Sequence, residues 1–439
     1  MTTTRGSRPS KHSGVAWLGE IPLSWDTVRS RRLFSQRKQR ALAEDVQLTA
    51  SQDFGVISQQ AFMDRVGRRV VQVELNPEIQ RHVERGDFVI SMRSFQGGIE
   101  VARESGCISS AYCILMPKPP VNHWYFARLL KCAPYIQALQ STSNLVRDGQ
   151  AMRFENFTLV DLPVVPPAEQ GAIAKFLDRK TATIDALIAK KERLIALLQE
   201  KRQALITQAV TKGLDLNVRM KESGVKWIGA IPSHWKIFRT KHAMARIVDC
   251  PHETPEVSPD FEYPAVRTSD VDRGRLFLDQ AQRVSEATYR ERTRRLVPEE
   301  GDILYSREGG RFGHAALVPS GVALCLGQRM MMFRARKKDH VPAYFMWVLN
   351  ADCTFGQVTQ ETLGSAAPRV NIPTVSNAWV PCPPRGEQAA IAEHIDRTLQ
   401  RTDALELSVA ASAERLREYR QALITAAVTG KIDLSKEAT

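Results

Sequence analysis

The chain lacks any apolar run that approaches the roughly 20 residues of a membrane span. Its first residues, from Met1 to Arg8, contain no apolar core of the kind found in signal peptides. We therefore expect a cytoplasmic protein. The seven cysteines are odd in number and form no C-x-x-C pair, so the sequence indicates neither a disulfide framework nor a structural zinc site.

Sequence signatures of catalysis are also missing. No Gly-x-Gly-x-x-Gly and no Gly-x-x-x-x-Gly-Lys-Ser/Thr is present to cradle a nucleotide. The nine histidines are dispersed without an H-E-x-x-H pair, and no dense group of carboxylates offers a magnesium site. We predict no catalytic residue, no metal and no cofactor bound by this chain.

Positive charge, by contrast, is in excess. The 439 residues include 61 Lys+Arg against 48 Asp+Glu, which gives a net charge of +13. This excess favours a polyanionic partner, and nucleic acid is favoured over membrane because no basic amphipathic anchor stands out. The length and the 43% of hydrophobic residues are typical of two to four domains with proper cores.

The chain is a tandem duplication. Residues Gln203–Thr211 return almost unchanged as Gln421–Thr429, and Ser13–Trp25 returns as Ser223–Trp235. We call the second pair the Trp boxes. The segments between these repeats have little in common, so we expect one symmetric frame that presents two different surfaces. Because the sequence ends where a third Trp box would begin, we also expect its ends to lie close together.

A second repeat starts two long helices. Pro163-x-x-Pro166-x-x-Glu169-Gln170 recurs as Pro381-x-x-Pro384-x-x-Glu387-Gln388. Prolines before a first turn and a glutamate within it are typical of a helix N-terminus. About forty residues without proline follow each motif, enough for a rod of roughly 60 Å.

Heptad spacing predicts that these helices pair with each other, antiparallel. The alternative is that each helix packs on its own domain. The apolar residues of the predicted seam are Leu177, Ile184, Leu187, Leu194, Leu198 and Leu205 in the first helix and Ile395, Leu405, Val409, Leu416 and Leu423 in the second.

The diverged segments, about 20–162 and 230–380, have the pattern of mixed α/β domains, with short apolar runs closely punctuated by glycine and proline. We predict helices near Asn122–Leu139 and Pro342–Leu349. The predicted strands include Phe88–Ile90, Tyr112–Met116, Ile303–Tyr305 and Met330–Phe333.

Both domains contain a strand that runs into a basic, Gly-rich turn, Gly86–Gly98 and Gly301–Gly313. Such a turn brings a backbone close to another chain, and its arginines suit phosphates or guanine edges. The alternative is a hairpin turn with solvated arginines. Candidate DNA-binding residues in these turns are Arg93, Ser94, Gln96, Arg307 and Arg311.

An element present in both halves cannot by itself make the halves read different targets. We therefore assign the shared turn to phosphate positioning or folding, and seek base contacts in the unshared parts. For these residues the alternative is an ordinary solvated charge run. The candidates there are Arg65, Arg68, Arg69, Arg267, Thr268, Arg294 and Arg295.

Taken together, these motifs resemble the specificity subunits of type I restriction-modification systems over nearly the whole chain. The resemblance is carried by the Trp boxes, by Gly86-Asp-Phe-Val-Ile-Ser-Met-Arg-Ser94, by Leu326-Gly-Gln-Arg-Met330 and by the Glu-Gln-x-Ala-Ile-Ala that opens both helices. It implies an α+β fold in which two mixed α/β target recognition domains are separated by an antiparallel coiled coil. The first recognition domain, with its Trp box, would be residues 1–165, and the first long helix would lie in residues 166–222. The second recognition domain would be residues 223–382, and the second long helix would lie in residues 383–439.

The resemblance further implies a noncatalytic reader of double-stranded DNA. Each domain would recognise half of an asymmetric bipartite site, and the helices would fix the spacer as a ruler. The frame would dock two methyltransferase subunits and a restriction subunit, a translocase and nuclease. S-adenosylmethionine, ATP and Mg would then be bound by those partners. Two alternatives are a coiled-coil scaffold that binds DNA without sequence preference and a DNA-modifying enzyme with an unrecognised site.

Overall fold

The computed structural model describes residues 8–67, 79–91, 99–142, 152–215, 217–251, 253–360 and 369–434. The chain forms two compact units. Unit 1 consists of Met1–Lys191 and Ala411–Thr439, and unit 2 of Glu192–Ala410. Each unit therefore combines one mixed domain with part of each long helix, so the helices do not form a separate domain.

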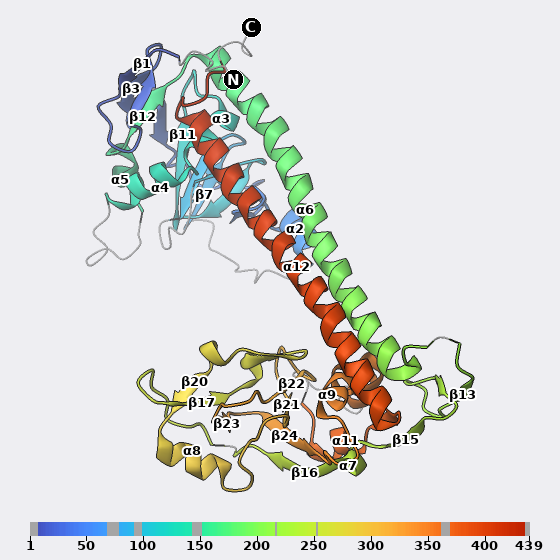
Figure 1. The fold of residues 1–439 in the computed structure, drawn as a ribbon. Coiled ribbons are helices and arrows are strands. Elements are labelled where there is room, and N and C mark those ends of the chain that lie inside the picture. Colours follow the sequence, from blue (N-terminus) through green and yellow to red (C-terminus); the bar gives the residue numbers. More distant parts are fainter. Residues whose placement is uncertain are drawn as a thin grey trace. The chain divides into compact units, whose positions relative to one another are not determined.

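Unit 1 contains small sheets, short helices and part of each long helix, α6 (Pro167–Lys212) and α12 (Arg385–Val428) (Figure 1). Its strands are β1 (Ser10–His12), β2 (Glu20–Pro22), β3 (Asp26–Arg29), β4 (Phe34–Gln36), β5 (Leu48–Ser51), β6 (Gly55–Ser58), β7 (Gln80–Val83), β8 (Phe88–Ser91), β9 (Glu100–Val101), β10 (Gly106–Ser109), β11 (Tyr112–Pro117) and β12 (Asp161–Val164). Its short helices are α1 (Ser30–Leu33), α2 (Gln59–Val66), α3 (His123–Leu129), α4 (Ala133–Gln140) and α5 (Phe154–Thr158).

Unit 2 is built in a similar way around the other parts of the long helices. Its strands are β13 (Met220–Glu222), β14 (Ala230–Pro232), β15 (Lys236–Arg239), β16 (Met244–Asp249), β17 (Tyr263–Val266), β18 (Val271–Asp272), β19 (Arg275–Leu276), β20 (Gln282–Val284), β21 (Ile303–Ser306), β22 (Ala315–Leu317), β23 (Cys325–Leu326), β24 (Met330–Ala335) and β25 (Trp379–Cys382). Its helices are η2 (Thr268–Asp270), η3 (Leu278–Gln280), α7 (Thr240–Ala243), α8 (Glu286–Thr293), α9 (Pro342–Asn350), α10 (Asp352–Gln360) and α11 (Ile372–Asn377).

The duplication extends to the sheets. The main sheet of unit 1 has the order β4-β11-β8-β9, and that of unit 2 has the matching order β16-β24-β21-β22. All neighbouring strands in both are antiparallel. The four strands predicted from the sequence are β8, β11, β21 and β24, and the predicted helices correspond to α3, α4 and α9. These predictions are confirmed, as is the mixed α+β fold.

The shared Gly-Asp of both domains closes the turn that starts the third strand of the main sheet. Asp87 accepts a hydrogen bond from the Glu84 N–H at 2.9 Å and lies in an ion pair with Arg37. Asp302 accepts from the Glu299 N–H at 2.9 Å and pairs with Arg334. Both carboxylates are almost fully buried. The aspartate of the shared motif therefore serves folding, one of the two roles that we predicted for it.

Each domain has an aromatic core that continues onto the long helices. In unit 1 the Phe34 ring meets the rings of Phe88 and Phe126 edge-on, with centroids 5.6 and 5.5 Å apart. This core includes Leu177 of α6 and Val428 of α12. The core of unit 2 likewise includes residues from the end of α6 and the start of α12. Burial of this apolar surface is the main force that holds the helix ends to the domains.

The two repeated motifs bind each other. The indole N–H of Trp25 donates to the Glu169 carboxylate at 3.0 Å, and that of Trp235 donates to Glu387 at 2.9 Å. Both indoles are fully buried. A buried indole N–H needs an acceptor, and the glutamate at the start of each helix supplies it. Each Trp box therefore contacts the Glu-Gln motif of the same unit. We call this contact, which occurs in both units, the Trp–Glu joint.

The far end of each helix also joins a domain and a Trp box. The Tyr125 hydroxyl donates to the Val428 carbonyl at 2.8 Å, and the Tyr344 hydroxyl lies within donating distance of the Pro381 carbonyl at 3.1 Å and the Val210 carbonyl at 3.3 Å. Gly430, with φ of 75°, follows α12, and a Cβ there would lie 2.5 Å from the Pro22 side chain. Lys431 donates to the Glu20 carbonyl. Segments near the two ends of the sequence therefore lie close together, whereas the ends themselves, which we predicted to be neighbours, lie outside the described residues.

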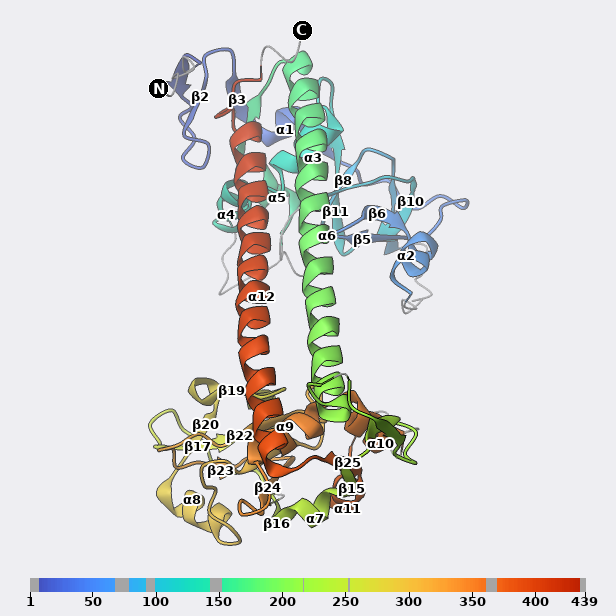
Figure 2. The ribbon, with the colours of Figure 1, turned by 45° about the vertical axis from the view of Figure 1, so that its right-hand side comes forward.

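The long helices pair antiparallel within each unit, where they lie side by side (Figure 1 and Figure 2). In unit 1 Asp185 forms an ion pair with Arg420 at 2.8 Å, and in unit 2 the Gln199 amide donates to Glu406 at 2.8 Å. Pairing between the helices and packing on the domains both occur, so the two sequence interpretations describe different parts of the same helices.

Half of the predicted seam is displaced by one residue. The first seam position recurs every seven residues from Leu177 in α6 and from Ile395 in α12, and its residues are buried or half-buried as predicted. Among them are Ile184, Leu198, Leu205, Val409, Leu416 and Leu423. The second seam position, however, is occupied by Thr181, Ile188, Ile195, Arg202 and Ala209 in α6 and by Leu399, Glu406, Ala413, Arg420 and Ala427 in α12. Leu187, Leu194 and Leu405 are instead 43, 41 and 48% exposed. The prediction for these three residues is wrong.

Two further features of the described residues bear on function. All seven cysteines are free and buried. Among the described helices, none is both long and apolar enough to cross a membrane.

Candidate nucleic-acid interface

Three loops of unit 2 meet at one edge. Strands β17 and β23 are parallel neighbours, so the residues after them, Arg267 and Gly327, lie together. The Gly327 N–H donates to the Val266 carbonyl at 2.7 Å. The loop after β21 joins them, because the Arg307 N–H donates to the Arg329 carbonyl at 2.9 Å. This topology gathers segments that are distant in sequence.

Arginine side chains surround this edge. Arg329 and Arg369 are 62 and 60% exposed and both pair with Glu308, each at 3.1 Å. Arg311 donates to the Ser269 carbonyl at 2.6 Å, and Arg267 lies 3.6 Å from Asp270 in an ion pair. We call Arg267, Arg311, Arg329 and Arg369 the basic loop cluster. Exposed guanidinium groups on adjoining loops suit contacts with phosphates and base edges.

Arg307 does not belong to this exposed set. Its guanidinium pairs with Asp249 and donates to the Val370 carbonyl at 3.1 Å, and the residue is 4% exposed. The structure therefore gives Arg307 a structural role inside unit 2 in place of the DNA contact predicted from the sequence. A buried charge that already has a carboxylate partner cannot leave it without a large desolvation cost.

The helix α8 brings further arginines beside the same edge. Arg292 is buried and donates to the Leu326 carbonyl at 2.9 Å, which ties α8 to the strand before Gly327. The neighbouring Arg294 and Arg295, predicted to bind DNA, are exposed. Thr268 is partly exposed in η2 and lies near Gly309. Among the candidates of unit 2, the structure thus brings together Arg267, Thr268 and Arg311.

Unit 1 places one predicted DNA-binding residue within the described residues. Arg65 is exposed near the end of α2, with its guanidinium 5.3 Å from the centre of the Phe54 ring. The remaining predictions for this unit lie outside the described residues. They are Arg68, Arg69, Arg93, Ser94 and Gln96.

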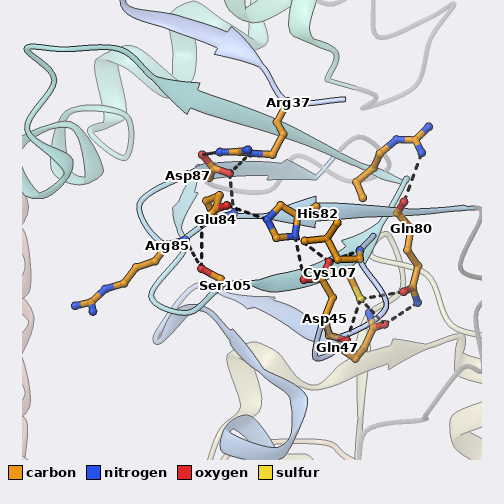
Figure 3. A network of polar contacts seen from close by, with 12 residues as sticks. Arg37, Asp45, Gln47, Gln80, His82, Glu84, Arg85, Asp87, Ser105 and Cys107 are labelled. Atoms are coloured by element: carbon orange, nitrogen blue, oxygen red, sulfur yellow. Dashed lines mark hydrogen bonds and ion pairs between the residues drawn. The ribbon is translucent and has the colours of Figure 1, made fainter. Parts of the chain in front are cut away.

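A polar network of unit 1 links β7 to the loop before β5 (Figure 3). The almost fully buried imidazole of His82 contacts Asp45 at 2.8 Å through Nδ1 and Glu84 at 3.0 Å through Nε2. Burial lowers the pKa of His82, but the hydrogen bonds with Asp45 and Glu84 outweigh it and raise the pKa above the usual 6.5. The hydrogen bond with His82 in turn lowers the pKa of Glu84 below 4.5. Two carboxylates thus favour the imidazolium.

This network predicts a pH-dependent stability of unit 1. Because the pKa of His82 is higher in the folded chain, its stabilising contribution is complete below the unfolded pKa and disappears as pH rises through the folded value. We expect His82→Gln to lower the urea midpoint more at pH 6 than at pH 9. The matched control is the exposed His242→Gln in unit 2, which should leave the urea midpoint of unit 1 unchanged. An equal loss at both pH values would contradict a charged His82.

Within the described residues, no three His, Cys, Asp or Glu side chains are grouped so as to hold a metal ion. Arg329 and Arg369 are not among the DNA-binding residues predicted from the sequence. Arg329 lies in Leu326–Met330, which the sequence identifies only as part of the family resemblance.

The chain is similar to known proteins in sequence and in fold. A family model described as the type I restriction modification DNA specificity domain matches residues 256–414. The chain is 24% identical over 373 residues to the EcoKI type I restriction enzyme specificity subunit of Escherichia coli. This alignment covers 79% of this chain and 75% of that protein. It is 22% identical over 420 residues to the MjaVIII specificity subunit of Methanocaldococcus jannaschii, spanning 94% of each.

The fold also has a solved counterpart. A chain from a structure that describes complex assembly and conformational transition of the type I R-M system matches with a TM-score of 0.63 and 16% identity. The match covers 94% of this chain and 99% of the other.

Proposed function

Because this chain belongs to the family of type I restriction-modification specificity subunits, we propose that it reads an asymmetric, bipartite site on double-stranded DNA. Each unit contacts one half of the site through the loops of its mixed domain. The chain itself is noncatalytic and binds no cofactor. The chemistry belongs to two methyltransferase subunits and a restriction subunit that dock on it, with S-adenosylmethionine, ATP and Mg.

One observation carries this proposal: the two units share a frame but differ around it. Their main sheets have the same strand order, and the same Trp–Glu joint holds each domain. Yet β7 leads to β8 through residues 84–87 alone, whereas α8 is inserted between β20 and β21. A common frame with different peripheral parts is what two unlike half-sites require.

The charge of the chain supports a DNA partner independently. The net charge of +13 provides attraction to phosphates regardless of sequence. The basic loop cluster concentrates part of that charge on one edge of unit 2. Arginines of this kind supply both phosphate contacts and bidentate contacts with guanine.

The test is selection from a pool of randomised duplexes by the full chain, alone and with its methyltransferase subunits, at moderate salt. We expect retained duplexes to contain two unlike half-sites at a constant gap. Salt-sensitive retention without any enriched sequence would overturn the proposal and favour a non-specific scaffold. Binding of S-adenosylmethionine by the isolated chain would argue against a noncatalytic reader.

A further inference from the structure

One short helix is fixed in the same way in both units. α1 comes after the first Trp box and α7 after the second. Ser30, the first residue of α1, donates to the Val160 carbonyl, and Thr240, the first residue of α7, donates to the Ala378 carbonyl at 3.1 Å. Both hydroxyl-bearing residues are buried. The two helices therefore sit at equivalent places, each against the start of the strand that precedes a long helix.

The loop after the second strand of each main sheet packs on this helix. The Lys118 N–H, after β11, donates to the Leu33 carbonyl at 2.8 Å, and the Arg336 N–H, after β24, donates to the Ala243 carbonyl at 2.9 Å. Each short helix and its loop thus form one continuous surface. We call the cationic residues of these surfaces the basic platforms. They are Arg31, Arg32 and Lys118 in unit 1 and Lys241, Arg336, Lys337 and Lys338 in unit 2.

The charges of the basic platforms have no carboxylate partner. Among the described residues, no Asp or Glu side chain forms an ion pair with any of these cations. Lys241 donates to the neutral Asn377 side chain at 2.8 Å, and Lys337 donates to the Glu300 carbonyl at 2.7 Å. Arginines of the basic loop cluster, by contrast, pair with carboxylates. Except for the half-buried Lys118, the platform residues are exposed, so their charge is available to an anionic partner.

The repetition of the basic platforms indicates what kind of partner they suit. A surface that reads one of two unlike half-sites must differ between the units. A surface that binds the same protein twice must occur in both. The platforms have the same position, the same backbone contact and the same sign of charge in each unit, although Arg31 of α1 corresponds to Lys241 of α7. They therefore meet the second condition.

The platform of unit 2 is also separated from the basic loop cluster. Arg329 directly precedes β24 and Arg336 directly follows it, so the two surfaces lie at opposite ends of this strand of six residues. At about 3.3 Å per residue, the strand places roughly 20 Å between them. A duplex held by the loops therefore leaves the platform free for a second partner.

We propose that each basic platform is the docking surface for an acidic patch on one of the two methyltransferase subunits. The inference rests on the proposed function and adds to it the surface used for docking and the charge that the partner must carry there. Exposed charges of this kind speed the encounter and select the orientation of the partner. Because salt screens exposed charges, assembly weakens as ionic strength rises.

The experiment measures how many methyltransferase subunits the full chain binds, by analytical ultracentrifugation at a subunit concentration slightly above the wild-type Kd. The charge-reversed variants are Arg31→Glu with Arg32→Glu in unit 1 and Lys241→Glu with Lys337→Glu in unit 2. We expect each variant to lose one of two bound subunits, and the combined variant to lose both. Affinity at the altered platform should fall about tenfold or more, because like charges then oppose the partner. Arg31→Lys with Arg32→Lys should keep both subunits.

A matched control separates the platforms from a general effect of charge. Arg397→Glu with Arg401→Glu changes the net charge equally at exposed positions of α12 and should leave two subunits bound. An equal loss of subunits in this control would contradict the inference. The affinity of the isolated chain for a random duplex should fall no further in the platform variants than in the control. A larger fall would assign the platforms to DNA phosphates and overturn the proposed protein contact.

The outcomes also distinguish this inference from the proposed function. If wild type binds two methyltransferase subunits and the charge-reversed variants bind two with unchanged affinity, the platforms are not the docking surface and the proposed function stands. If wild type binds no methyltransferase subunit, the proposed docking fails and the inference fails with it.

Discussion

Replacing Asp302 by alanine is expected to lower the free energy of unfolding of unit 2 by about 3–5 kcal/mol, because one partner of a buried ion pair is removed. Asp302 is fully buried and accepts from Arg334 Nε at 2.9 Å, from Arg334 Nη2 at 2.7 Å and from the Glu299 N–H at 2.9 Å. Without the carboxylate, the Glu299 N–H loses its partner, and the Arg334 guanidinium keeps only the Glu299 carboxylate, at 3.2 Å, and the Val297 carbonyl, at 2.6 Å. Few single substitutions in this chain should cost more.

Urea unfolding followed by tryptophan fluorescence measures this loss. The exposed Asp260 is a matched control, and its alanine variant should stay within about 0.5 kcal/mol of wild type. Adding Arg334→Met to Asp302→Ala should recover part of the loss, because the remaining charge is removed as well. A loss below about 1 kcal/mol for Asp302→Ala alone would contradict this expectation, because it would show that water solvates the remaining Arg334 charge as well as the carboxylate does.

Lengthening both long helices by seven residues should abolish recognition of the wild-type site, with an affinity loss of at least tenfold. The insertions belong between Lys191 and Glu192 in α6 and between Ala410 and Ala411 in α12, where the chain divides into its units. Seven residues preserve the heptad repeat and add about 10.5 Å, the length of roughly three base pairs. If the helices fix the spacer, the half-sites stay the same and only the gap changes.

Selection from randomised duplexes distinguishes these outcomes. We expect each half-site to be recovered unchanged, with a longer gap between them. The matched control inserts seven residues in α6 only, which breaks the pairing of the helices and should abolish the constant gap altogether. Recovery of the wild-type gap by the doubly lengthened chain would contradict the proposed ruler.

The sequence predicted the frame well because its signals are local. Prolines followed by Glu169 and Glu387 predicted the starts of α6 and α12, which begin at Pro167 and Arg385. The repeated stretches predicted a frame shared by the two halves, but the strand order of the main sheets was not predicted. The joint between Trp25 and Glu169 was not predicted, because its partners are 144 residues apart and only the folded chain brings them together.

The seam error has a physical cause. A heptad accepts apolar positions spaced three then four residues or four then three, and α6 has adjacent apolar residues at Leu187/Ile188 and Leu194/Ile195. Either choice therefore gives a continuous apolar stripe. In the structure the stripe that contains Ile188 is the buried one, which leaves Leu187 exposed.

The candidate site was predicted only in part, because exposure depends on distant partners. Arg307 and Arg311 look alike in a Gly-rich turn, yet Asp249, 58 residues away, buries the first. Conversely, Arg329 and Arg369 were not selected, although Glu308 brings both to one edge. Whether a charged side chain is exposed, and where it points, depends on the counterions that the fold places beside it.

The Tyr125 hydroxyl donates to the Val428 carbonyl at the end of α12, and the Tyr344 hydroxyl lies 3.1 Å from the Pro381 carbonyl and 3.3 Å from the Val210 carbonyl of α6. A main-chain carbonyl is present whatever side chain its residue has. Substitutions at Val428 or Val210 leave the acceptor in place. Each domain is therefore attached in part through a tyrosine, a tryptophan and a glutamate that both units share. Substitutions elsewhere in a domain leave these three contacts in place, so the rest of its surface can change while this part of the attachment is kept.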